Sequence, residues 1–360
     1  MTQFKEPIIN NIETISPSIV NSFNVCPKKA AYFLDSNFSE LLKGSTSSSL
    51  GKIAHFVLAD ANNLESQPNS IERQDWFNEN WKKYEDQEFL SLQNDWNYAE
   101  VPKPMSWNKY HAVKSSVKYK VLEKHSRFKG TGNVEKPDQI RVKFPISEKY
   151  LVNKNLGLKG KPDLIDKHNG VISIIDYKTG SLTEDTLEDY SRQLHLYVIL
   201  VEEELKLEIE KLYIFGNTVE EIELVRSRLP VLQKEIAIIL GNLKENNFKA
   251  KPSLESCKFC SFKVYCEDFW KISFSFKADR PLILKGKVSQ IHKTGDSSYF
   301  SIDLNLVESV PKYDFKSIRL HKISSKFQIE LDSEYSFMGN LDYLLEDQFR
   351  VNWNTIVVKI

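Results

Sequence analysis

The apolar positions in the first part of the chain follow the spacing of helices. From Ser16-Pro17, an N-cap followed by proline at the first helical position, this spacing predicts a helix to about Leu34. A Ser/Thr/Gly stretch over 44–49 is typical of a loop, and a second helix is expected to begin near Leu50. His55 lies about one turn into that second helix.

The pattern changes to that of strands from Gln139 onward. Apolar residues alternate with polar ones over 139–146, which predicts a strand. Two more strands are expected over 164–166 and 171–177, joined by a turn at Gly170. The second of these is almost wholly apolar, as expected of a central strand that is buried on both faces.

Strands and helices then follow one another. The spacing predicts, in order, a helix, two strands and a long amphipathic helix over 190–205, 211–215, 221–225 and 229–246. This combination indicates an α/β fold in which helices are layered against a sheet.

The C-terminal part consists of alternating, β-branched or aromatic segments with polar turns between them. These segments predict five strands over 282–294, 298–308, 316–323, 334–339 and 348–360. Five strands in so short a segment suit a small closed β-barrel of the OB or SH3-like type. We therefore expect two domains, over residues 1–278 and 279–360.

The composition is that of a globular protein without a charge bias. The chain has 360 residues, 41% of them hydrophobic, which is long enough for two domains with cores. Its 49 Lys and Arg balance its 49 Asp and Glu, so any contact with a polyanion must be local. No apolar run has the length of a membrane helix and no export signal opens the sequence, so we expect a cytoplasmic protein without a membrane partner.

Two acids and a lysine stand at the ends of predicted strands. Asp176 and Lys178 project from the same face because strand side chains alternate, and Asp163 on the neighbouring strand can converge on them. Two such carboxylates suit a Mg²⁺ or Mn²⁺ ion that activates water, while the lysine stabilises charge at a phosphate. Taken alone, residues 176–178 leave open the alternative that the acids only mark strand ends and the lysine is solvated.

In combination with the Pro162-Asp163 pair and the apolar strand between the acids, the pattern resembles that of the PD-(D/E)xK nucleases. Gly51 and His55 precede the acids, as the glycine and the helical histidine of the RecB-like branch do. Gln193 and Tyr197, four residues apart and hence on one face of a helix, resemble the Gln-x-x-x-Tyr motif of the same branch.

This resemblance covers roughly residues 16 to 270 and implies a restriction-endonuclease-like mixed sheet flanked by helices. The implied metal site consists of His55, Asp163, Asp176 and Tyr177. The implied catalytic residues are His55, Asp163, Asp176, Lys178, Gln193 and Tyr197, the last two of which would contact the substrate strand. The chain departs from its relatives in one respect, because the segment 141–145 lacks the glutamate that they commonly place in the strand before the first metal-binding aspartate.

The four cysteines comprise Cys26 and a cluster of Cys257, Cys260 and Cys266 far along the chain. One alternative is a zinc site, for which four thiolates with a C-x-x-C turn are usual, and another is an ordinary buried thiol at Cys26. The arrangement is similar to the iron–sulfur staple of AddB-type and CRISPR-adaptation nucleases. That similarity implies a [4Fe–4S] cluster that cross-links distant parts of the chain.

Two further segments bear on possible partners. Residues 44–52 resemble a phosphate-binding loop but lack the Walker spacing, since Thr46 and Ile53 occupy positions that need Gly and Ser or Thr. The basic stretch 103–129 is either a solvated helix face or a site for single-stranded nucleic acid, which binds where aromatic side chains interleave positive ones. Its aromatic residues include Trp107, Tyr110, Tyr119 and Phe128.

We therefore expect a metal-dependent DNA nuclease that hydrolyses phosphodiester bonds, preferring single-stranded DNA or DNA ends. The resemblance implies a separate helicase or ATPase partner and a role in DNA repair, CRISPR adaptation or phage defence. The alternative is a catalytically silent DNA-binding or scaffold subunit of a helicase–nuclease complex, against which the complete set of acids argues.

Overall fold

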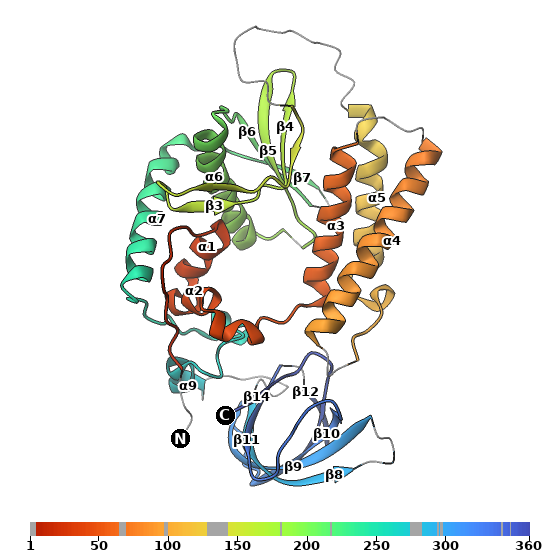
Figure 1. The fold of residues 1–360 in the computed structure, drawn as a ribbon, viewed down its shortest axis with the longest axis vertical. Coiled ribbons are helices and arrows are strands. Elements are labelled where there is room, and N and C mark those ends of the chain that lie inside the picture. The colour runs from red at the N-terminus through yellow and green to blue at the C-terminus, as the bar shows by residue number, and fades with distance from the viewer. Residues whose placement is uncertain are drawn as a thin grey trace.

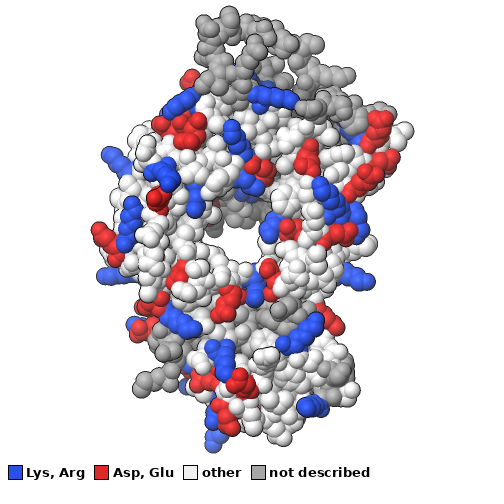
Figure 2. Space-filling view, viewed as in Figure 1, with Lys and Arg blue, Asp and Glu red and all other residues white. Residues whose placement is uncertain are grey.

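The computed structural model describes residues 5–64, 70–96, 100–127, 143–180, 182–216, 218–273, 283–293, 295, 298–339, 341–345 and 347–360. Within this part of the chain, helices and two large sheets surround a central opening (Figure 1), and the space-filling view shows that the opening passes through the molecule (Figure 2). Figure 1 places α3 on one side of the opening, α1 and α6 on the other, and the C-terminal sheet at one end.

The helices lie mainly before and between the strands of the first sheet. They are α1 (Pro17–Val25), α2 (Pro27–Leu34), α3 (Thr46–Asn62), α4 (Ser70–Asp95), α5 (Tyr110–Arg127), α6 (Glu184–Leu205), α7 (Leu229–Lys244), α8 (Leu254–Lys258) and α9 (Glu267–Ile272), with 3₁₀ turns η1 (Ser36–Leu41), η2 (Pro104–Ser106) and η3 (Arg226–Arg228). None of the helices among the described residues is long and apolar enough to cross a bilayer.

The first predicted helix is in fact two helices, because Cys26 and Pro27 interrupt it. The Ser16 hydroxyl caps α1 by accepting a hydrogen bond from the backbone N–H of Ile19 at 3.4 Å. Cys26 has extended backbone angles, since a helical conformation before proline would clash with the ring. This interruption places Cys26 at the start of α2.

The second predicted helix begins earlier than expected. Ser45 and Ser48 form a capping box in which each backbone N–H donates to the hydroxyl of the other, at 2.9 and 3.0 Å. α3 therefore starts at Thr46, and most of the segment 44–49, predicted to be a loop, is its first turn. A capping box likewise lets α6 begin before the predicted start.

A five-stranded mixed sheet lies at the centre of the first part of the molecule. Its strand order is β1-β4-β5-β6-β7, with β5 and β6 parallel and all other neighbours antiparallel. The strands are β1 (Ile146–Ser147), β4 (Leu164–His168), β5 (Val171–Tyr177), β6 (Lys211–Phe215) and β7 (Val219–Ile222), beside a separate hairpin of β2 (Leu151–Asn153) and β3 (Leu158–Gly160). The predicted α/β fold with a mixed sheet is confirmed.

The first predicted strand is confirmed only at its end. Of 139–146, the described structure assigns Ile146 to β1, while 139–142 lie outside the described residues. The hairpin of β2 and β3 was not predicted, because its strands have only three residues each.

Helices cover both faces of the five-stranded sheet. Ile174 of β5 and Leu212 of β6 pack into a core with α6 and α7, whereas Ile175 and Tyr177 of β5 pack into another with α3, α4 and α5. Alternation of side chains along β5 produces this division. The prediction that this strand is buried on both faces is confirmed.

The C-terminal sheet has seven strands rather than the predicted five. The strands are β8 (Ile283–Lys293), β9 (Tyr299–Val310), β10 (Ser317–Ser324), β11 (Glu334–Met338), β12 (Leu341–Leu345), β13 (Gln348–Val351) and β14 (Ile356–Lys359). The range 348–360 divides in two because a turn intervenes, in which the Thr355 N–H donates to the Asn352 carbonyl at 3.0 Å. β12 was missed because it follows β11 and precedes β13 almost without a break.

The predicted closed OB- or SH3-like barrel is not confirmed. The strand order is β12-β13-β10-β9-β8-β11-β14, and no pairing between the two end strands occurs among the residues described. Register shifts in the β8–β9 and β9–β10 pairs bend the sheet without joining its edges.

Candidate active site

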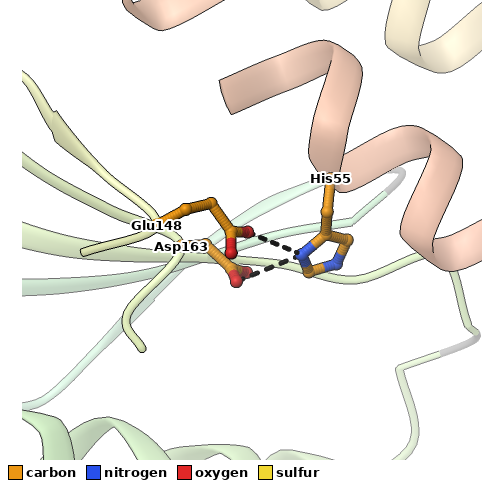
Figure 3. A group of neighbouring side chains, drawn as sticks. All are labelled: His55, Glu148 and Asp163. Atoms are coloured by element: carbon orange, nitrogen blue, oxygen red, sulfur yellow. Dashed lines mark hydrogen bonds and ion pairs between the residues drawn. The ribbon is translucent and has the colours of Figure 1, made fainter. Parts of the chain in front are cut away.

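Three side chains from distant parts of the sequence meet at one end of the five-stranded sheet. His55 of α3 points toward Glu148 and Asp163 (Figure 3), with its Nδ1 atom 3.1 Å from Asp163 Oδ1 and 3.6 Å from Glu148 Oε1. Each residue offers one ligand atom, and these atoms all lie within 4.8 Å of one another. An imidazole and two carboxylates at this separation are suited to hold a single cation.

Glu148 is the acid that sequence inspection found missing before Asp163. It follows β1 directly and has a positive φ of 52°, and its backbone N–H donates to the Asp163 carbonyl at 3.1 Å. Lys161 forms an ion pair with its other carboxylate oxygen. The strand pattern did not indicate Glu148 because this residue lies just after the strand, although it is the one acid between Arg141 and Asp163.

The neighbouring strands position the two predicted acids. Asp163 precedes β4 and uses its second oxygen, Oδ2, to accept a hydrogen bond from the Tyr177 backbone N–H at 2.7 Å. Asp176 is almost completely buried on β5, where Lys178 Nζ lies 2.5 Å from its Oδ2 atom. Register pairs Leu164 with Ile175, so the two acids lie beside each other at the end of these strands.

Burial and charge perturb the titration of this cluster. Burial, followed by the nearby Asp163 carboxylate, raises the pKa of Asp176 to about 6, although Lys178 opposes this shift. Burial alone would lower the pKa of His55, but hydrogen bonds to the Asp163 and Glu148 carboxylates outweigh it and raise the value to about 10. In the protein alone a proton on His55 therefore supplies the positive charge that the carboxylates require.

The donor set fits a divalent cation on grounds of this structure. Asp176 Oδ2 is buried and, apart from its ion pair with Lys178, has no hydrogen bond of suitable geometry. Two further carboxylates converge on a protonated imidazole, which a bound cation would replace as the positive charge. His55, Glu148 and Asp163 are the residues that the structure brings close enough to share an ion, with Asp176 and the backbone of Tyr177 adjacent.

Lys178 connects the acids to α6. Its Nζ atom donates to Gln193 Oε1 at 3.2 Å, and the Gln193 amide donates to the Tyr197 hydroxyl at 3.3 Å. The ammonium group also lies 4.5 Å from the ring centroid of Tyr190, a cation–π contact that the sequence did not indicate. The structure thus brings Lys178, Gln193 and Tyr197 together in one hydrogen-bonded chain.

A glycine makes room for that chain. A Cβ atom at Gly160 would lie 2.9 Å from a ring carbon of Tyr197. At Gly51, by contrast, a Cβ would lie 3.6 Å from the Thr179 hydroxyl, an ordinary contact. Close packing therefore explains why residue 160 is a glycine. It does not explain the glycine at 51, which the resemblance to the nuclease family had pointed to.

The aromatic residues of the basic stretch divide into two kinds. Trp107 and Tyr110 are buried in the core shared by α3, α4 and α5, so neither ring is available to stack on bases as the nucleic-acid alternative for this stretch requires. The reason is that their rings fill the space between helices. Tyr119 is exposed, and Phe128 lies outside the described residues.

The four cysteines come from both ends of the first part of the chain and are half-buried. Cys26 stands at the start of α2 and accepts a hydrogen bond from the Lys251 N–H at its Sγ atom, at 3.4 Å. Lys28 on α2 pairs with Asp268 on α9 at 3.3 Å, two residues after Cys266. This contact joins α2 to the helix that Cys266 begins.

The structure does not gather the four thiols into a metal site: among the described residues, the group of three or more possible metal ligands is His55, Glu148 and Asp163. Burial, with smaller contributions from Asp268 and Cys260, raises the pKa of Cys266 to about 11, so the protein alone keeps this thiol protonated. A metal ion or cluster bound by these thiols would offset the unfavourable free energy of a buried thiolate. Three of the cysteines also pack against a core that extends into the C-terminal sheet, through residues such as Tyr32, Phe262 and Ile283.

Comparison with known protein families matches residues 14–267 to the PD-(D/E)XK nuclease superfamily. No curated protein matches the chain. The matched segment contains the five-stranded sheet, the cluster around His55 and Asp163, and all four cysteines, and it ends before the C-terminal sheet.

Proposed function

This chain belongs to the PD-(D/E)XK nuclease superfamily, and from that premise we propose that it is a Mg²⁺- or Mn²⁺-dependent deoxyribonuclease that hydrolyses phosphodiester bonds. The observation that carries the proposal is the convergence of His55, Glu148 and Asp163, with their ligand atoms within 4.8 Å of one another. A structural protein would not need to bury Asp176 beside these acids, because each buried carboxylate costs solvation energy.

The cluster would act as a metal site in which His55, Glu148, Asp163 and Asp176 hold the ion, with the Tyr177 backbone beside it. A divalent ion in such a site polarises a phosphoryl oxygen and lowers the pKa of a bound water. The hydrogen bond from the Tyr177 N–H keeps the Asp163 carboxylate in position, so both its oxygens are used. The ion pair with Lys161 likewise holds the Glu148 carboxylate in position.

Lys178 would stabilise the charge that develops on the phosphate. Gln193 accepts one of its hydrogen bonds and Tyr190 lies against the ammonium group, so two residues of α6 fix its direction. Gln193 and Tyr197, joined to each other, would then orient the substrate strand next to the reacting phosphate.

The proposed substrate is single-stranded DNA with a free end. The opening that passes through the molecule (Figure 2) is bordered by α3, the helix that carries His55. A strand that reaches the site through a closed opening has to enter by its end, and a duplex is much wider than one strand. Circular single-stranded DNA is therefore expected to resist digestion that linear DNA of the same sequence undergoes.

The four cysteines would bind a [4Fe–4S] cluster, with zinc as the alternative occupant. Four thiolates are the usual ligands of both. Its role would be mechanical, since Cys26 and Cys266 are separated by most of the matched segment and a cross-link of that length stabilises a fold by about 5 kcal/mol. The segment 279–360 would be an accessory domain that contacts the DNA or a helicase partner.

The test is digestion of labelled single- and double-stranded DNA by the purified protein with Mg²⁺, Mn²⁺ or EDTA. Cleavage that needs a metal and that disappears in Asp176→Asn would support the nuclease. Asp166→Asn, on the neighbouring strand, is the matched control because its side chain accepts a hydrogen bond from the adjacent Lys167 backbone N–H and is not part of the group around His55. Protein that carries its full metal complement and binds DNA without cutting it would favour the catalytically silent scaffold instead.

A further inference from the structure

A second lysine approaches the reaction centre from the helix opposite Lys178. Lys120 on α5 donates from Nζ to the backbone carbonyl of Phe215 at 3.4 Å and lies 5.9 Å from the ring centroid of Tyr177. The same carbonyl accepts the backbone N–H of Lys178 at 2.9 Å. Lys120 therefore reaches the backbone position at which the catalytic lysine leaves β5.

The two lysines lie on opposite faces of the sheet. Lys178 extends toward α6, where it contacts Tyr190 and Gln193. Lys120 contacts the ring of Tyr177, whose side chain belongs to the core between the sheet and α3, α4 and α5. Two ammonium groups thus flank the end of β5.

Lys120 differs from the other lysines of the site in its surroundings. Lys161 and Lys178 each form an ion pair with a carboxylate, Glu148 and Asp176 respectively. Among the residues that the structure describes, no carboxylate lies within ion-pair distance of Lys120, whose hydrogen-bond partner is a neutral carbonyl. A half-buried ammonium group without a counter-ion is unfavourable by itself and is suited to an anionic ligand.

We propose that Lys120 binds a backbone phosphate of the DNA strand, adjacent to the phosphate that is cleaved beside Lys178. Phosphates recur regularly along a strand, so a strand that crosses the end of β5 would present one to Lys178 and a neighbouring one to Lys120. This proposal rests on the nuclease activity proposed above and adds a second phosphate-binding position to it. Lys120 is a substrate-positioning residue and takes no part in bond cleavage.

A purely structural role makes different predictions. If Lys120 only satisfies the Phe215 carbonyl, its loss lowers the melting temperature and leaves the salt dependence of DNA binding unchanged. A phosphate contact instead releases counter-ions from the DNA. For single-stranded DNA, each such contact steepens the fall of the logarithm of the binding constant with the logarithm of salt concentration by about 0.7.

The experiment compares the full-length protein with Lys120→Met, Lys120→Arg and Lys211→Met. Lys211 lies at the far end of β6 from Phe215 and pairs with Glu221 at 3.0 Å, so its loss removes an equal charge away from the site. Binding of a labelled single-stranded oligonucleotide is measured by anisotropy at several NaCl concentrations, with Ca²⁺ in place of Mg²⁺. Steady-state cleavage is measured with Mg²⁺ or Mn²⁺.

We expect Lys120→Met to weaken binding by about tenfold, as for one charge-assisted contact, and to lower the salt slope by about 0.7. KM should rise by a similar factor with kcat nearly unchanged, Lys120→Arg should restore most of the binding, and Lys211→Met should match the parent protein. If Lys120→Met fails to fold, the same comparison is made with Lys120→Gln, which keeps a hydrogen-bond donor for the Phe215 carbonyl.

The possible failures are distinguishable. Cleavage by the parent protein combined with an unchanged salt slope and KM in Lys120→Met would overturn the phosphate contact and leave the nuclease in place. An equal change of the salt slope in Lys120→Met and Lys211→Met would also overturn the phosphate contact, because the effect would then come from the total charge of the protein. Absence of metal-dependent cleavage with a slope change confined to Lys120 would overturn the nuclease and retain the phosphate site.

Discussion

The carboxylate of Asp163 accepts a hydrogen bond from the backbone N–H of Tyr177 at 2.7 Å. One oxygen of the side chain is thereby held by the neighbouring strand, while the other faces the imidazole of His55 at 3.1 Å. A strand-to-strand contact thus sets the direction of the acid that helix α3 meets, and the site depends on the alignment of β4 with β5 as much as on the residues themselves.

Replacement of Glu148 should weaken metal binding. Glu148→Gln keeps the size of the side chain but removes the charge that faces His55, so we expect the concentration of Mg²⁺ or Mn²⁺ needed for half-maximal cleavage to rise about 10- to 100-fold. Titration of activity with each metal measures this. Glu13→Gln is the control, since Glu13 also pairs with a lysine, Lys154, but on the surface. Equal metal requirements in all three proteins would show that Glu148 lies outside the metal site.

The stability of the metal-free protein should depend on pH through His55. Because its pKa is about 10 in the folded protein against 6.5 ordinarily, the imidazolium stabilises the fold fully below about pH 6.5 and loses this effect as the pH rises toward 10. With EDTA present, the melting temperature should fall across this window, by several degrees. In His55→Gln that fall should be much smaller, and a slope that persists unchanged in the variant would contradict the assignment.

A bound metal ion should counteract this loss of stability at high pH. A bound cation takes the place of the proton on His55, so we expect the apparent metal affinity to increase with pH until the imidazole is neutral. Protein saturated with Mn²⁺ should therefore keep its melting temperature above neutral pH better than the EDTA-treated protein does. Identical profiles with and without metal would argue against His55 as a ligand.

A methyl group at Gly160 should disturb the chain from Lys178 to Tyr197. In Gly160→Ala the new Cβ would lie 2.9 Å from the Tyr197 ring, so the ring must shift, which disturbs the hydrogen bond between Tyr197 and Gln193. We expect a loss of about 1–3 kcal/mol in the free energy of unfolding, as for overpacking, together with reduced cleavage. Denaturant unfolding and DNA digestion measure the two effects.

Gly241→Ala provides the control for that variant, because among the described residues no atom outside its own stretch of helix lies within 4 Å of a Cβ placed at Gly241. This second substitution falls in α7 and should leave cleavage unchanged while slightly stabilising the helix. Full activity in Gly160→Ala would mean that the position of the Tyr197 ring does not matter for the reaction.

Loss of Cys26 should remove the proposed cysteine-bound metal centre and loosen the fold. In Cys26→Ser we expect the iron or zinc content to fall and the free energy of unfolding to decrease by about 2–5 kcal/mol, the usual effect of losing a long-range cross-link. Absorbance near 400 nm together with iron and zinc analysis of the parent protein distinguishes the cluster from zinc. Ser256→Ala, next to Cys257, is the control. Unchanged metal content in Cys26→Ser would leave Cys26 as an ordinary thiol.

Part of the site was accessible from local patterns. The apolar run of 171–177 predicts a strand buried on both faces. Because side chains alternate along a strand, Asp176 and Lys178 are predicted to project from the same face. Gln193 and Tyr197 share a helix face because they are four residues apart, and the structure joins them by a hydrogen bond. Each of these relationships depends on neighbours in the sequence.

Other features were beyond the reach of the sequence. Five C-terminal strands were predicted in place of seven because the turn between β13 and β14 was not recognised and because β12 falls between two of the predicted ranges. Trp107 and Tyr110 looked like surface aromatics among lysines, since local charge does not reveal which side of a helix is covered by its neighbours.

The sequence by itself determined the order of the chemical groups, from the helical histidine through the two acids to the lysine and the Gln/Tyr pair, because each belongs to a short segment with its own periodicity. Only the tertiary structure decided that Glu148 joins His55 and Asp163 and that Lys120 reaches the end of β5. These contacts link segments far apart along the chain, and their geometry comes from the pairing of strands and the packing of helices on them, which no local spacing encodes.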